Sequence, residues 1–156
     1  MGRRYTAVIN AVAVSAAQDL FALKTSANVP LILHECRIGQ TTDKGNAAEE
    51  ILRVRILRGT TTLGSGGTTP TPQPADPGDA AAVCTTHVND TTPSSAGTQV
   101  TLLEDTFNDR AGWLYVPVPE DRFLCPVGTI ISINLPTAPA NSITVSATLI
   151  FEEFGK

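Results

Sequence analysis

The chain has 156 residues, of which 42% are hydrophobic and 17% are charged, and its formal net charge is −4. This length fits a single domain, residues 1–156, with a core of its own, and the negative charge gives no general attraction to nucleic acid or anionic lipid. No apolar run approaches the roughly 18 residues that a membrane-spanning helix needs.

The first half of the chain contains short segments in which apolar and polar residues alternate, as in half-buried strands. The alternation is clearest where Leu52, Val54 and Ile56 are separated by arginines. One turn of helix is expected at 44–50, which is rich in Ala and Glu. Strands are expected at 5–10, 19–25, 30–40 and 50–59.

The second half returns to strand patterns after an ambiguous segment, 79–90, which could form a short helix or a strand. Pro117 and Pro119 indicate a strand end or an edge strand, because proline cannot donate to a ladder. Further strands are expected at 98–107, 112–125, 129–136 and 141–154. About eight short strands with turn signals between them predict an all-β, antiparallel β-sandwich of the jelly-roll or Ig-like kind. No helical pattern alternates with the strands, which disfavours a parallel α/β sheet.

Residues 59–80, here called the Thr/Gly/Pro tract, form the longest stretch without a strand pattern. A loop of this length inside a compact domain is uncommon and is usually functional or disordered. Its four prolines favour extended, polyproline-like backbone, and the sequence GSGG before them would act as a hinge. We therefore expect an arm: a glycine pivot followed by a stiff segment that reaches a neighbouring subunit.

The residue types of catalytic and metal sites are sparse. His34 and Cys36 share one face of a strand and could meet His87 or Cys84, but metal sites usually need three or four closely spaced ligands. Cys36, Cys84 and Cys125 are expected to be buried thiols rather than a disulfide framework. The serine in GSGG lacks the following helix of a nucleophile elbow. The sequence therefore predicts no enzyme, no catalytic residue, no metal and no cofactor.

Several residues are instead candidates for contact with a partner. Arg53, Arg55 and Arg58 form a basic ridge, which is either a solvent-facing side with cross-strand partners such as Glu35 or a patch that docks on an acidic protein. Trp113 and Tyr115 share a face that could belong to the core or to a contact surface. Nucleic-acid binding is disfavoured, because aromatic residues are not interleaved with the basic ones. The candidate contact residues are Arg3, Arg4, Arg53, Arg55, Arg58, Pro70, Pro72, Pro74, Trp113 and Tyr115.

Four segments resemble a family of small virion-associated proteins of tailed bacteriophages that are similar to capsid decoration, or cement, proteins. They read AVAVSAAQDLFAL, EEILRVRILRGTTTLGSGGTTPTPQPADPGDAAA, DTFNDRAGWLYVPVPEDR and ITVSATLIFEEF. The resemblance covers nearly the whole chain and carries no catalytic motif. It implies a protein made in the host cytoplasm that coats an icosahedral head. There it would bind the major capsid protein and itself, as a trimer at local threefold positions.

Two other functions fit the same composition. The chain could be a tail- or fibre-associated module, or a glycan-binding β-sandwich for host recognition. Neither of these, nor the cement role, calls for a small-molecule substrate.

Overall fold

The computed structural model describes residues 2–41 and 49–154, which form strands and one short 3-10 turn. The elements are β1 (Arg3–Val14), β2 (Gln18–Lys24), β3 (Leu31–Gln40), β4 (Ile51–Thr62), β5 (Gln73–Pro74), β6 (Thr85–Asp90), β7 (Ser95–Asn108), β8 (Trp113–Tyr115), η1 (Pro119–Asp121), β9 (Leu124–Cys125), β10 (Ile130–Leu135) and β11 (Ile143–Glu153).

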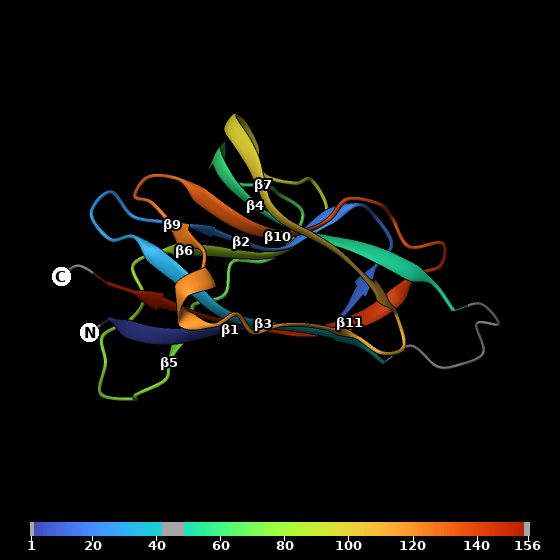
Figure 1. Ribbon diagram of the computed structural model, residues 1–156, viewed down its shortest axis with the longest axis horizontal. Coiled ribbons are helices and arrows are strands. Elements are labelled where there is room, and N and C mark those ends of the chain that lie inside the picture. Colours follow the sequence, from blue (N-terminus) through green and yellow to red (C-terminus); the bar gives the residue numbers. More distant parts are fainter. Residues whose placement is uncertain (1, 42–48, 155–156) are drawn as a thin grey trace.

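The strands form two antiparallel sheets that stack on each other (Figure 1). Sheet A has the order β5-β1-β11-β3-β8, with β9 also paired to β3, and sheet B has the order β6-β2-β10-β4-β7. The predicted all-β sandwich is therefore confirmed.

The pairing pattern identifies the kind of sandwich. Without β5, β6 and β9, the first strand of the chain pairs with the last, the second with the second last, and so on inward: β1 with β11, β2 with β10, β3 with β8, and β4 with β7. Four nested antiparallel pairs of this kind, folded alternately into two sheets, make a jelly roll. The chain between β4 and β7, which contains β5 and β6, is the tip of that long rolled hairpin.

The core lies between the two sheets and follows the period-two pattern of the sequence. Along β11 every second residue is buried, from Ile143 to Glu153, because successive side chains of a strand point to opposite faces. Leu52, Val54 and Ile56 point inward from β4 as predicted, with exposed fractions of 2% or less. Every residue of β10 is buried, so the outer face of sheet B is covered at this strand.

The structure differs from the predicted strands in three places. The strand expected at 112–125 is split into β8 and β9, because the chain leaves the sheet at Pro117 and turns through η1 at Pro119. The ambiguous segment 79–90 is extended and ends in β6. The helical turn expected at 44–50 lies mostly outside the described residues.

The outer face of sheet B is covered where the chain itself crosses the sheet. Because β6 and β7 occupy opposite edges of this sheet, the connection Thr91–Ser94 must cross it. Asp19 and Asn134 lie on the outer face, since Asn134 pairs with Arg55, yet both are at most 5% exposed. The Ser94 amide and hydroxyl donate to Asp19 Oδ2 at 2.8 and 2.5 Å, and Asn134 Nδ2 donates to Oδ1 at 2.8 Å. The crossover is thus fixed to a buried carboxylate by hydrogen bonds, as a buried polar group requires.

The first half of the Thr/Gly/Pro tract runs beside this crossover. The amides of Ser65 and Thr92 each donate to the carbonyl of the other at 3.0 Å. Thr68 and Val88 exchange a similar pair of bonds at 3.0 and 2.9 Å. The tract is therefore paired to β6 and to the chain that follows it.

The second half of the tract reaches the edge of sheet A. There β5 pairs with β1 at Tyr5 and Thr6, the Ala75 amide donates to the Arg4 carbonyl at 2.8 Å, and the Tyr5 hydroxyl donates to the Ala80 carbonyl at 2.9 Å. The tract thus joins the edge of one sheet to the edge of the other, as the loop on the left of Figure 1 shows for β5.

The prediction that this tract forms a projecting arm with a glycine pivot is therefore wrong. A Cβ atom on Gly64 would lie 2.1 Å from the Thr92 carbonyl oxygen, and one on Gly67 would lie 2.1 Å from that of Val88. These glycines allow two backbones to approach closely rather than supplying a hinge. The segment that does project is the ribbon formed by the ends of β4 and β7, at the top of Figure 1.

We expect Gly67→Ala to lower the free energy of unfolding by about 1–3 kcal/mol, because the methyl group overlaps the Val88 carbonyl. Gly78→Ala is the matched control in the same tract, since its Cβ would meet only the Asp76 side chain, at 3.3 Å. Urea unfolding of both variants measures the difference. Equal stability of the two would mean that the tract does not pack on β6.

Candidate interaction surface

Trp113 and Tyr115 point into the core from β8. Each is 7% exposed, their rings stack with centroids 6.1 Å apart, and Tyr115 stacks in turn on Phe123 at 5.8 Å. Trp113 Nε1 also donates to Asp105 Oδ2 of β7 at 3.1 Å, which links the edges of the two sheets. Of the two alternatives for this aromatic pair, the core is correct, and the prediction that they contact a partner is wrong.

The opposite side of the same segment is exposed instead. Leu114 is 63% exposed, and Val116 and Val118, at the next alternate positions, are 59% and 57% exposed. Leu124 and Val127 follow at 41% and 43%. We call Val116, Val118, Leu124 and Val127 the apolar rim. The sequence shows this alternation, but both of its sides are apolar, so the pattern alone does not say which side faces out.

Leu114 belongs to a second exposed surface, the outer face of sheet A. The register places Val8, Thr148, Arg37 and Leu114 side by side across β1, β11, β3 and β8. Next to this row, Gly39 and Ser146 are paired. We call these six residues the open face. Val8 is 51% exposed, and a shallow hollow of about 360 Å³ lies over β1, β11 and β3, with Gly39 in its floor.

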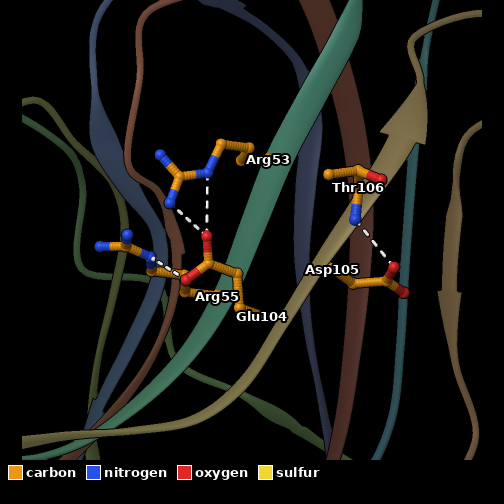
Figure 2. A network of polar contacts seen from close by, with 5 residues as sticks. All are labelled: Arg53, Arg55, Glu104, Asp105 and Thr106. Atoms are coloured by element: carbon orange, nitrogen blue, oxygen red, sulfur yellow. Dashed lines mark hydrogen bonds and ion pairs between the residues drawn. The ribbon is translucent and has the colours of Figure 1, made fainter.

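Two arginines of the predicted basic ridge share one carboxylate. Arg53 donates through Nε to Glu104 Oε1 at 2.9 Å and also bonds this oxygen through Nη2, and Arg55 Nε donates to Oε2 at 3.1 Å (Figure 2). The arginine side chains hold the pKa of the Glu104 carboxyl below its usual value, with Arg53 contributing first. The cross-strand partner is thus Glu104 rather than Glu35, which bonds Arg37 instead.

Arg58 is not part of this ridge. Its Nη1 donates to the Leu124 carbonyl of β9 at 2.8 Å, so the side chain connects sheet B to sheet A. Its position follows from the register, because Arg58 pairs with the core residue Ile131 rather than continuing the outward series of Arg53 and Arg55.

The other predicted contact residues lie around the tract. Arg3 makes an ion pair with Asp79 at 3.4 Å, and Arg4 pairs with Glu152 across β1 and β11. Pro72 is buried, whereas Pro70 and Pro74 are half-buried. The structure therefore brings Arg3 and Arg4 close to Asp79 and Pro74 of their own chain.

The reactive groups of the chain are held in structural roles. Burial raises the pKa of all three cysteine thiols, which removes the thiolate that a nucleophile or metal ligand needs. His34 Nε2 lies 2.8 Å from Glu152 Oε2, and Glu152 Oε1 accepts the Gly2 amide at 2.8 Å. Within residues 2–41 and 49–154, no group of three His, Cys, Asp or Glu side chains is placed to hold a metal ion, and no helix is long and apolar enough to cross a membrane.

Comparisons with known proteins give no family for this chain. No protein-family profile and no curated protein matches it. Among solved structures, the chain was aligned with the infectious bursal disease virus VP2 subviral particle at a TM-score of 0.13 and 11% identity, over 100% of this chain and 40% of that one. The chain thus spans less than half the length of that protein, and a TM-score this low supports no conclusion about fold or function.

We expect His34 to make stability fall as the pH drops below neutrality. Burial, followed by the nearby Arg122, lowers the pKa of its imidazole below the ordinary 6.5, although Glu152 opposes this. Between pH 6.5 and the folded-state pKa, the unfolded chain therefore binds the proton more readily, and unfolding becomes easier.

The measurement is the free energy of unfolding of the wild type and of His34→Gln at pH 7.5 and 5.5. The variant should lose less stability over this interval than the wild type. An equal or larger loss in the variant would contradict the assigned role of His34.

Proposed function

We propose that this protein is a structural virion protein that decorates and stabilises a bacteriophage capsid, by binding capsid subunits and other copies of itself. The observation that carries the proposal is the difference between the two sides of the sandwich. A crossover and the first half of the Thr/Gly/Pro tract lie on the side of sheet B, whereas the open face and the apolar rim expose six large apolar side chains. Clustered apolar side chains on the surface of a folded domain are typical of protein interfaces.

The fold is compatible with this role but does not establish it. Jelly rolls build viral capsid proteins and lectins alike, and a fold by itself does not determine function. The resemblance of the four sequence segments to phage virion proteins selects the capsid among these possibilities. The same resemblance places the protein on the capsid surface after synthesis in the host cytoplasm, with the major capsid protein as its partner.

The surface offers less to a glycan. Sugar-binding sites commonly use exposed aromatic rings, yet all eight aromatic residues of this chain are buried or half-buried. Trp113 and Tyr115, the aromatic pair separated by one residue in the sequence, are in the core. This favours the capsid role over the alternative of a glycan-binding module for host recognition.

An enzymatic function has similarly little support. The two histidines are bonded to the carboxylates of Glu152 and Asp90, and the cysteine thiols are buried. A decoration protein needs no reactive group, only shape, rigidity and an interface, and a jelly roll of two hydrogen-bonded sheets supplies these.

We assign the apolar rim to the capsid. Its four residues lie in the segment from the end of β8 to the start of β10, where Pro117 and Pro119 prevent the addition of another strand. A partner can therefore bind here through side-chain packing. The acidic residues Glu120 and Asp121 of η1 are exposed between the apolar ones and would favour a partner surface with basic groups.

The test is binding of the purified protein to undecorated capsids of its phage. Wild type should co-sediment with the capsids and raise their resistance to heat. Val118→Asp should weaken binding by at least about tenfold, because it places a charge in an apolar contact. Val83→Asp is the control, since Val83 is 40% exposed but lies outside the rim. Absence of binding by the wild type, or equal binding by both variants, would contradict the assignment.

A further inference from the structure

The open face of sheet A is the largest uncovered part of the sandwich. Strands β1, β11 and β3 present Val8, Thr148 and Arg37 on it, and β8 adds Leu114 at the edge. Figure 1 shows these strands as the lower layer, which β5 extends beside β1 at one end. By contrast, Asp19 and Asn134 on the outer face of sheet B are buried beneath Ser94. Within residues 2–41 and 49–154, Val8 and Leu114 of this face are left exposed, so a partner molecule can bind there.

The charges of this face balance, since Arg4 lies beside Glu152 in the register of β1 and β11. Arg37 bonds Glu35 through its Nε, and Glu152 accepts from Gly2 and faces His34 at the end of the sheet. Apart from Glu152, the outward-facing residues of β11 are Thr144, Ser146, Thr148 and Ile150, which carry no charge. A nearly neutral face has no electrostatic preference for nucleic acid or for a strongly charged protein, and it does not repel a second copy of itself.

The face also contains a projection and a depression that can fit each other. Leu114 projects from β8 with 63% of its side chain exposed. The hollow begins on the neighbouring strand, because Gly39 has no side chain, and a Cβ at this position would meet only the Ser146 carbonyl oxygen at 4.0 Å. A two-fold axis in the interface would let Leu114 of each copy enter the hollow of the other. Such an isologous contact uses one patch twice.

The area of the open face agrees with a second copy of the protein as its partner. At about 3.3 Å per residue and about 4.8 Å between strands, the three long and three short strands of sheet A cover about 600 Å². A stable protein–protein interface buries about 800 Å² on each partner. A second copy of the same sheet covers the whole face, whereas a single peptide strand would cover about a quarter of it.

We infer that two copies of this protein pack sheet A against sheet A, with Leu114 of each copy inserted into the hollow at Gly39 of the other. The contact deepens the self-association in the proposed function and rests on it. It gives a two-fold dimer, which differs from the threefold arrangement that the resemblance implies. The rim residues Val116, Val118 and Val127 lie outside the strands of sheet A, so the dimer can still bind a capsid through them.

The test is the mass of the protein alone, measured by sedimentation equilibrium at concentrations from about 1 to 200 μM. The wild type should reach twice the 16.4 kDa of the chain. Leu114→Glu should weaken the dimer by at least tenfold, because it removes the projection and places two carboxylates in the interface. Gly39→Leu should have the same effect by filling the hollow, and its side chain has room in the monomer.

Val83→Glu is the control for an added carboxylate outside the face, and urea unfolding of each variant checks that it folds. A wild type that stays monomeric at 200 μM, or that forms a trimer, overturns the inference, as does a dimer that both variants leave intact. Since no capsid is present, failure here leaves capsid binding by the apolar rim untouched. Conversely, a dimer that does not bind capsids would contradict only the proposed function.

Discussion

The crossing of sheet B by the chain is the constraint on which the rest of the structure depends. The rolled hairpin ends in β4 and β7, but the insertion at its tip adds β6 at the opposite edge, so the return to β7 must pass over β2, β10 and β4. Such a crossing brings backbone and polar side chains onto a sheet face that would otherwise be in water. Asp19 satisfies the Ser94 donors there and is itself held by Asn134. Burial raises the pKa of Asp19, so this anchor costs free energy that its hydrogen bonds must offset.

The Thr/Gly/Pro tract follows from the same crossing. It has to run beside the crossover and then reach the edge of sheet A, and its contacts on the way are mainly between backbones. Glycine permits the close approach at Val88 and Thr92, and proline keeps the remaining chain extended without using amide donors. With one side of the sandwich occupied in this way, we propose that partners bind the open face and the apolar rim.

The sequence predicts the features that depend on strong alternation. Leu52, Val54 and Ile56 define both the strand β4 and its inward face, and the strand expected at 141–154 contains β11. The alternation around Trp113 is equally regular, but both sides are apolar, so only the packed structure shows that Leu114 and Val118 face out. The position of the tract has no local signal at all, since its partners Thr92 and Val88 are far along the chain. Arg58 follows the same alternation, because it lies two residues after Ile56 and pairs with the core residue Ile131, so the period of two already separates it from Arg53 and Arg55.

Hydroxyl-radical footprinting of the protein in intact virions and free in dilute solution tests the central claim, that this jelly roll binds its partners through one side only. The account predicts that Val8, Leu114, Val118 and Leu124 become protected in the particle, whereas Thr61 and Val100 of the β4–β7 ribbon keep their reactivity. Protection of the ribbon with continued reactivity of Leu114 and Val118 would contradict it, and so would absence of the protein from purified particles.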